Sequence, residues 1–140
     1  MKVLLACDHA AFLEKEDIKS YLSEKFEVQD LGTHSIESVD YSDLGLLLAE
    51  GVKLEKCVGI ALCGSGIGIS MAVNRVKGVR GALCRDIEDA KMSKMHNNAN
   101  VICFGARRNS IDEIKKMIDV WIETEFEGGR HLDRIKNLDK

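Results

Sequence analysis

Short apolar runs alternate with stretches of helical spacing along the whole chain. Five runs predict strands, and three of them are almost continuously apolar, as is typical of strands covered on both faces. A repeated strand–helix order favours a parallel sheet with helices on both sides. The predicted fold is therefore α/β, a three-layer α/β/α sandwich around a five-stranded, parallel, Rossmann-like sheet. The predicted strands are Val3–Cys7, Glu27–Leu31, Cys57–Cys63, Val79–Cys84 and Val101–Phe104.

The segments between the strands carry the signals of helices. The clearest begins at Ser110, where Glu113 completes a capping box, a pair of reciprocal hydrogen bonds that starts a helix. Asp86 similarly precedes a helix that runs to about Met95. Apolar stripes predict the buried helix faces. Their members are Phe12, Leu13, Ile18 and Leu22 in the first helix, Leu44, Leu47 and Leu48 in the second, and Ile111, Ile114, Met117, Ile118, Trp121 and Ile122 near the C-terminus.

Composition narrows the classes of function. With 140 residues and no proline, the chain is expected to form one domain, residues 1–140, without a Pro-rich linker. A formal charge of −3 offers no basic surface for nucleic acid, and no apolar run approaches the ~20 residues of a membrane span. The five cysteines include no C-x-x-C pair and the histidines show no zinc spacing. We therefore expect free thiols, a reducing cytoplasm and no metal.

In parallel α/β sheets, ligands bind beyond the carboxyl ends of the strands, so the loops there hold the candidate site. The most distinctive loop is C-G-S-G-I-G at 63–68, which joins the central strand to a helix. Its glycines expose backbone N–H groups at a helix start, an arrangement that can hold a phosphate or a developing anion. A tight strand-to-helix turn is the plain alternative. The spacing matches neither G-x-G-x-x-G nor a triphosphate-binding P-loop. Asp86 follows the next strand, where an acidic residue could contact a ribose, so a dinucleotide site remains an alternative.

Polar residues at the same edge suggest catalytic and binding roles. Cys63 ends a strand beside the glycine loop, where a helix N-terminus favours a thiolate, and it is the candidate base or nucleophile. The other four cysteines are expected to pack as small apolar side chains. Asp8 and His9 follow the first strand and are candidates for ligand contact. Arg130 and Arg134 share one helical face, which suits either a phosphate or a solvated basic surface.

Six segments of the chain match, in order and spacing, the motifs of one protein family. They are C-D-H at 7–9, D-L-G-T-H at 30–34, E-S-V-D-Y at 37–41, C-G-S-G-I-G-I-S at 63–70, H-N-N-A-N-V at 96–101 and F-E-G-G-R-H at 126–131. Over essentially its whole length, the chain resembles the type B ribose-5-phosphate isomerases, in the family that also contains isomerases of galactose 6-phosphate and allose 6-phosphate. Ser65 stands where many members carry threonine, and it keeps the hydroxyl. Ser42 replaces a proline that often follows the Asp-Tyr pair.

The resemblance implies interconversion of ribose 5-phosphate and ribulose 5-phosphate through an enediolate, without a metal or cofactor. Cys63 would take the proton from C2, and His96 would assist opening of the furanose ring. The other implied roles are sugar contact by Asp8, His9 and Tyr41, enediolate stabilisation by Gly64, Ser65, Gly66, Ile67, Gly68 and Asn97, and phosphate binding by Arg107, Arg130 and Arg134. Two alternatives stay open: an isomerase of a six-carbon sugar phosphate, and a non-catalytic module that binds a sugar phosphate or nucleotide.

The topology adds an expectation about assembly. Cys63 ends a strand at the carboxyl edge of the sheet, whereas His96 follows a helix that returns to the amino edge, about 17 Å away along a five-residue strand. We therefore expect His96 and Asn97 to act in the site of a second copy, in a homodimer or a tetramer of paired dimers. The apolar face around Trp121 and the C-terminal helix with its arginines are the candidate interface elements.

Overall fold

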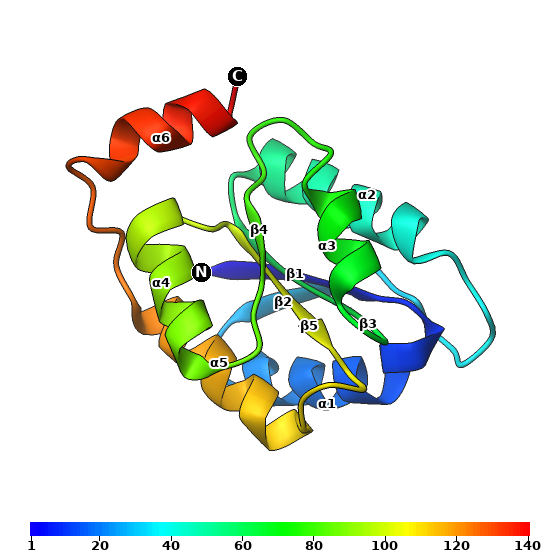
Figure 1. The fold of residues 1–140 in the computed structure, drawn as a ribbon. Coiled ribbons are helices and arrows are strands. Elements are labelled where there is room, and N and C mark those ends of the chain that lie inside the picture. Colours follow the sequence, from blue (N-terminus) through cyan, green and yellow to red (C-terminus); the bar gives the residue numbers. More distant parts are fainter.

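Five parallel strands form one sheet in the order β2-β1-β3-β5-β4 (Figure 1), in a computed structural model that describes residues 1–140. Every neighbouring pair in the sheet is parallel, and each predicted strand lies within two residues of its expected bounds. The predicted parallel sheet is therefore confirmed. The strands are β1 (Lys2–Cys7), β2 (Glu27–Asp30), β3 (Val58–Cys63), β4 (Gly81–Leu83) and β5 (Val101–Gly105).

Helices cover both faces of the sheet, in the three layers that the strand–helix order predicts (Figure 1). They are η1 (His9–Ala11, a 3-10 turn), α1 (Phe12–Ser23), α2 (Tyr41–Glu55), α3 (Ile67–Val73), α4 (Ile87–Asn97), α5 (Ile111–Glu123) and α6 (His131–Leu138). Helices α1, α4 and α5 pack on one face, and α2 and α3 pack on the other. Helix α6 lies outside this sandwich and contacts α4. None of the helices, of which the longest has 15 residues, combines the length and apolarity needed to cross a membrane.

The buried helix faces agree only in part with the apolar stripes. The face of α5 packs on the sheet as predicted, and Trp121 is fully buried there. The expectation that the Trp121 face forms an interface between copies is therefore wrong, because the sheet of the same chain already covers it. Leu13 and Leu47, which were assigned to buried stripes, are 70% and 51% exposed. On α1 the buried position near Leu13 belongs instead to Lys15.

Lys15 ties α1 to the carboxyl end of β2 through a fully buried ammonium group. Its Nζ donates to both carboxylate oxygens of Asp30, at 2.8 and 2.7 Å, and to the Thr33 carbonyl at 2.7 Å. Burial alone would raise the pKa of Asp30. Hydrogen bonds from Lys15, the Gly32 N–H and Lys19 outweigh that effect, so the pKa of Asp30 lies below its usual value.

Both predicted helix starts are confirmed by hydrogen bonds. The Ser110 Oγ accepts from the Glu113 N–H at 3.2 Å, and the Glu113 carboxylate accepts from the Ser110 N–H at 2.8 Å. The Asp86 carboxylate accepts from the Asp89 N–H at 2.8 Å. The helix that Asp86 starts, α4, runs to Asn97, so His96 lies in its last turn.

Candidate active site

The glycine loop at 63–68 leaves the sheet between the ends of β1 and β5. The Asp8 N–H donates to the Leu62 carbonyl at 3.1 Å, and the Ala106 N–H donates to the Cys63 carbonyl at 2.9 Å. These bonds hold the loops after β1, β3 and β5 together at one edge. The helices that follow β1 and β3 cover opposite faces, so these strand ends form the topological switch point where open α/β sheets usually bind ligands.

Cys63 lies inside this loop and is 4% exposed. Its Sγ accepts a hydrogen bond from the Gly66 N–H at 3.1 Å. Gly66 has a φ of +79°, and a Cβ there would lie 2.6 Å from Leu83 Cδ1 and 2.8 Å from the Gly105 nitrogen. Position 66 therefore needs glycine both for its backbone angle and for its close packing.

Free backbone donors lie in the same loop as the thiol. The N–H groups of Gly64, Ser65 and Gly68 donate no hydrogen bond within the chain. The Ser65 Oγ accepts from the Ile67 N–H at 3.1 Å, which leaves its O–H free to donate. Unused backbone donors in the loop that carries a thiol are suited to stabilising a negative charge that forms on a bound molecule.

Asp8, His9 and Arg107 lie at the same edge. The Asp8 carboxylate, on a residue only 7% exposed, accepts from the Ala10 N–H at 3.1 Å. The His9 Nδ1 accepts from the Val39 N–H at 3.1 Å, so its Nε2 is the nitrogen that remains for a ligand. The Arg107 guanidinium covers Gly64, where an added Cβ would lie 3.0 Å from Nη1. An acid, an imidazole and a guanidinium therefore accompany the thiol.

Tyr41 approaches the loop from the start of α2. Its ring lies against Gly68, where an added Cβ would be 2.7 Å from the Tyr41 Cζ. Tyr41, Ser42 and Gly68 line a hollow of about 200 Å³ between α2 and α3. The structure thus brings together most of the predicted site residues: Asp8, His9, Tyr41, Cys63, Gly64, Ser65, Gly66, Ile67, Gly68 and Arg107.

His96, Asn97, Arg130 and Arg134 lie elsewhere in the chain. His96 and Asn97 end α4, and after three intervening residues the chain enters β5 at Val101. Cys63 pairs with Gly105, at the opposite end of β5. Arg130 and Arg134 are exposed at the start of α6, which contacts α4. Within one chain, these four residues do not join the Cys63 loop.

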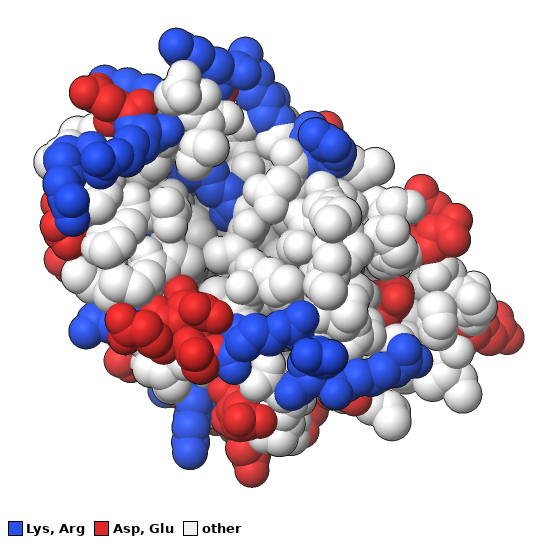
Figure 2. Space-filling view, in the orientation of Figure 1, with Lys and Arg blue, Asp and Glu red and all other residues white.

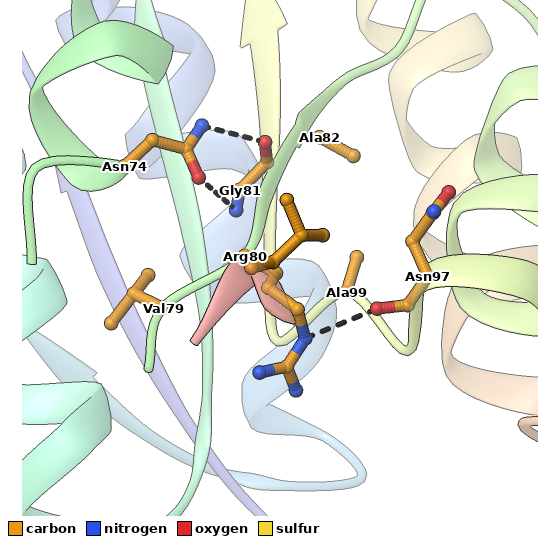
Figure 3. Close-up of a pocket in the computed structure, with 8 residues that line it drawn as sticks. Asn74, Val79, Arg80, Gly81, Ala82, Asn97 and Ala99 are labelled. Atoms are coloured by element: carbon orange, nitrogen blue, oxygen red, sulfur yellow. Dashed lines mark hydrogen bonds between the residues drawn. The ribbon is translucent and has the colours of Figure 1, made fainter. Parts of the chain in front are cut away.

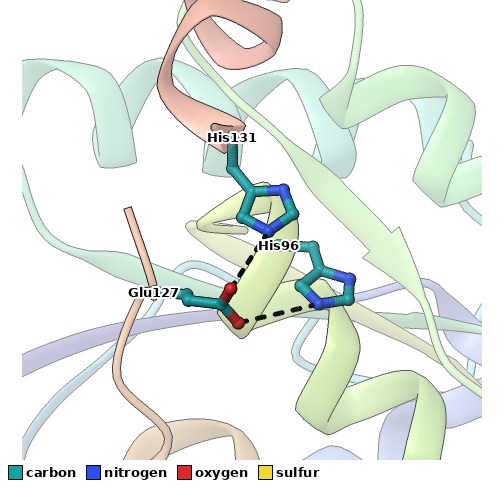
Figure 4. A group of neighbouring side chains, drawn as sticks. All are labelled: His96, Glu127 and His131. Carbon is teal, nitrogen blue, oxygen red and sulfur yellow. Dashed lines mark ion pairs between the residues drawn. The ribbon is translucent and has the colours of Figure 1, made fainter. Parts of the chain in front are cut away.

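His96 belongs instead to a cluster with two residues that the sequence did not single out, Glu127 and His131 (Figure 4). The His96 and His131 rings stack, with centroids 4.5 Å apart and planes inclined by 19°. Glu127 Oε2 lies 3.9 Å from His96 Nε2, and Glu127 Oε1 lies 3.6 Å from His131 Nε2. The spacing in sequence predicted no metal site; in the fold, three side chains of types that can ligate a metal converge across about 35 residues of sequence. Only the F-E-G-G-R-H motif marked this region in advance.

Asn97 also lines a cavity of about 360 Å³ beside the start of β4 (Figure 3). Arg80 fills one side, donating from Nε to the Asn97 carbonyl at 3.1 Å and from Nη1 to the Asp139 carboxylate at 2.8 Å. The Asn74 side chain exchanges two hydrogen bonds with the Gly81 backbone, at 2.9 and 2.8 Å. No sequence motif indicated Arg80 or Asn74.

The remaining cysteines carry no chemistry at this edge. Cys7, Cys84 and Cys103 are at most 1% exposed, which confirms that they pack in the core, although Cys84 lies just after β4. Burial raises the pKa of the Cys7 and Cys84 thiols to about 12, and it also raises that of Cys103. Cys57 is partly exposed just before β3, and burial and Glu55 raise its pKa. These thiols stay protonated near neutral pH.

Comparison with known proteins gives this geometry a context. Residues 3–138 match the family described as Ribose/Galactose Isomerase. The chain belongs to the ribose/galactose isomerase family. Ribose-5-phosphate isomerase B of Escherichia coli is 39% identical to it over 142 aligned positions, which cover 98% of this chain and 93% of the relative.

Solved structures of this isomerase family share the fold closely. Ribose-5-phosphate isomerase B of Clostridium thermocellum superposes with a TM-score of 0.97 at 42% identity, covering 99% of this chain and 95% of that one. The Mycoplasma genitalium ribose-5-phosphate isomerase B with bound ribulose-5-phosphate gives a TM-score of 0.94 at 37% identity, covering 98% and 93%. The resemblance drawn from the six motifs, and the prediction of an isomerase, are confirmed at the level of the family.

Proposed function

We propose that this chain interconverts ribose 5-phosphate and ribulose 5-phosphate, as a ribose-5-phosphate isomerase of type B, with Cys63 as the catalytic base. The relatives' activity supports the substrate class. The observation that carries the mechanism is the Cys63 Sγ at the carboxyl edge of the sheet, hydrogen-bonded to the Gly66 N–H in a loop that also contains unused N–H donors. A base beside preorganised donors is what proton transfer at a carbon acid requires.

The reaction begins with ring opening. His96 moves a proton to the ring oxygen, and the hydroxyl at C1 loses its proton as the carbonyl forms. The Cys63 thiolate then removes the proton from C2; the C2–H electron pair forms the C1–C2 double bond and the carbonyl pair moves to the C1 oxygen, which gives the enediolate. The free N–H groups of Gly64, Ser65 and Gly68, together with Asn97, stabilise this anion, and one donor of this kind contributes roughly 2.7–4 kcal/mol.

The second half returns the proton to the neighbouring carbon. The Ser65 hydroxyl carries a proton from O2 to O1, and the Cys63 thiol gives its proton to C1, which leaves the C2 ketone. Asp8 and His9 hold the sugar hydroxyls, and Tyr41 lines the pocket. Arg107, Arg130 and Arg134 bind the phosphate, for which the planar guanidinium is well suited.

We further propose that each site is shared between two copies of the chain. Within one chain, β5 separates the ends at which Cys63 and Asn97 lie, a span of about 13 Å at 3.3 Å per residue. A second copy related by a two-fold axis supplies His96, Asn97, Arg130 and Arg134 to the Cys63 loop, and receives the same residues in return.

An uncharged surface supports this pairing. Figure 2 shows few charged side chains over α3 and the adjoining part of α2. Several large apolar side chains of these helices are exposed, among them Leu54 at 83%, Met71 at 64% and Ile67 at 45%. Exposed apolar groups gathered on neighbouring helices mark a surface for another protein molecule. This surface and the C-terminal helix replace the Trp121 face as the candidate interface.

An isomerase of a six-carbon sugar phosphate is the second candidate, because the matching family includes galactose isomerases. One assay separates the possibilities: incubation in heavy water with ribose 5-phosphate, allose 6-phosphate or galactose 6-phosphate. We expect the highest turnover on ribose 5-phosphate, with deuterium at C2 of the recovered aldose. Faster turnover of a hexose phosphate would favour the second candidate. Neither ketose nor deuterium from any of the three would leave only a binding function.

A further inference from the structure

Three side chains of types that can ligate a metal meet where α4 ends and α6 begins (Figure 4). The ligating atoms of His96, Glu127 and His131 all lie within 4.8 Å of one another. The Glu127 carboxylate lies beside the two stacked imidazoles, with one oxygen toward each Nε2 at 3.9 and 3.6 Å. The segment that carries Glu127 is fixed to α4, because the Glu127 N–H donates to the Met95 carbonyl at 3.0 Å. The backbone therefore holds this cluster in place.

His131 has a buried ring nitrogen that lacks a hydrogen-bond partner. Its side chain is 6% exposed, and its Nε2 is a buried atom without a hydrogen-bond partner. A buried polar atom that lacks a partner costs free energy, typically about 1–3 kcal/mol. The atom faces Glu127, but their separation of 3.6 Å exceeds a hydrogen bond. An ion placed between the imidazole and the carboxylate would satisfy this nitrogen.

The donor set fits a borderline divalent transition metal. Two imidazoles and one carboxylate bind Zn²⁺ and its neighbours in the first transition series, with one position left open for water or another ligand. Zinc bonds of about 2.0–2.2 Å place tetrahedral ligand atoms roughly 3.4 Å apart. The two separations from Glu127 are a few tenths of an ångström wider, and all three ligand atoms lie within 4.8 Å of one another. The Glu127 and His96 side chains, 46% and 35% exposed, have room to close that gap.

We propose that His96, Glu127 and His131 form a binding site for Zn²⁺ or a similar divalent ion, and that the bound ion inhibits the enzyme. The ion occupies Nε2 of His96, the group that opens the sugar ring, and adds positive charge at that nitrogen. His96 then neither donates nor accepts the ring-opening proton. The binding site stands on the geometry alone, whereas the inhibition rests on the proposed function.

The test of binding uses the full-length chain with Co²⁺ and Zn²⁺. We expect one ion per chain, a visible Co²⁺ absorption band of a low-coordinate site, and displacement of Co²⁺ by Zn²⁺. Removal of a side chain that only hydrogen-bonds to a metal ligand weakens metal binding by roughly 10–100-fold. Glu127→Gln and His131→Gln remove a ligand itself, so each should weaken Co²⁺ binding by at least about tenfold. Glu127→Gln keeps the shape of a half-exposed side chain, so it tests the site even if His131→Gln fails to fold.

The matched control is His34→Gln. His34 Nδ1 lies 3.9 Å from the Asp30 carboxylate, the same histidine–carboxylate spacing as at His96, but without a second imidazole. Cys57→Ser controls for the partly exposed thiol. Both controls should bind Co²⁺ as the wild-type chain does. No saturable binding, or wild-type affinity in Glu127→Gln, would overturn the proposal, as would an equal loss of affinity in His34→Gln.

The test of inhibition compares isomerase turnover with and without Zn²⁺. We expect turnover to fall with the same dissociation constant that the binding measurement gives, and a chelator to restore it. In Glu127→Gln, at least about tenfold more Zn²⁺ should be needed. Zn²⁺ binding that leaves turnover unchanged would overturn the inhibitory role. A metal-free wild-type chain without isomerase turnover would overturn the proposed function instead, and the Co²⁺ titration would still decide whether the site exists.

Discussion

The Gly66 N–H donates a hydrogen bond to the Cys63 Sγ at 3.1 Å, from a backbone position that a side chain could not occupy. Gly66 has a φ of +79° and packs against the β5 backbone. Gly66 therefore both packs against the sheet and donates the hydrogen bond to the thiol. This relationship connects the packing of the sheet to the chemistry proposed for its carboxyl edge.

Substitution of Gly66 by alanine should damage both stability and activity. The new Cβ would lie 2.6 Å from Leu83 Cδ1 and 2.7 Å from the Phe104 carbonyl carbon, so the loop must move. Gly78→Ala is the matched control, since Gly78 also has a positive φ, +91°, but nothing lies within 4 Å of an added Cβ. In urea unfolding, Gly66→Ala should lose about 1–3 kcal/mol more than Gly78→Ala. Equal losses in the two variants would show that packing at Gly66 is not critical.

Substitution of Cys63 by serine should remove the base and leave the fold intact. A positioned general base contributes typically 10²–10⁴-fold, so turnover and C2 proton exchange should fall by about that factor. The small, buried side chain is replaced by one of similar shape, and the urea midpoint should change little. Cys57→Ser, which changes a thiol distant from the loop, should keep wild-type turnover. Wild-type C2 exchange in Cys63→Ser would exclude Cys63 as the base.

Substitution of Lys15 by methionine should destabilise the fold, because it leaves the Asp30 carboxylate buried without its main partner. Breaking a buried pair in this way costs about 3–5 kcal/mol. Lys19→Met is the control: Lys19 contacts the same carboxylate at 3.2 Å but is 42% exposed, so its loss should cost at most about 1 kcal/mol. Urea unfolding at pH 7 measures both, and similar losses would contradict the role assigned to Lys15.

The Lys15–Asp30 pair also predicts a pH dependence. The folded state holds the pKa of Asp30 below its usual 3.8, so the folded state binds this proton less tightly than the unfolded chain does. The resulting stability is present above pH 3.8 and is lost as the pH falls through the lower folded-state pKa. In Lys15→Met, the loss of unfolding free energy between pH 5 and pH 3 should be smaller than in the wild-type chain. If Lys15→Met and the wild-type chain lose the same unfolding free energy between pH 5 and pH 3, the low pKa of Asp30 does not depend on Lys15.

The sequence predicted the sheet well because its strands are apolar on both faces, and few other structures require such runs. It failed where burial depends on a distant partner. A lysine in a helix indicates an exposed position, and only Asp30, which follows fifteen residues later on β2, explains why Lys15 is buried while Leu13 is exposed. Periodicity likewise indicated an apolar face at Trp121, but not whether a sheet or a second molecule covers it.

In the candidate site, too, the sequence identified residues that are neighbours in the chain and missed residues that meet only in the fold. Residues of the Cys63 loop follow each other in sequence, so a motif identifies them. His96, Glu127 and His131 come from three segments and meet only after α4, the connecting segment and α6 are packed. Their spacing in sequence carries no zinc signature, because such signatures record ligands that are neighbours on one turn or hairpin.

The central claim, that Cys63 of one chain works with His96 of another, is tested most directly by complementation. Cys63→Ser and His96→Gln chains, each inactive alone, are co-expressed with two different affinity tags, and the heterodimer is purified. In this heterodimer, one of the two sites contains an intact Cys63 and an intact His96, so we predict about half of the wild-type turnover. Turnover no higher than that of the two parents would contradict the claim and place both residues in the site of a single chain.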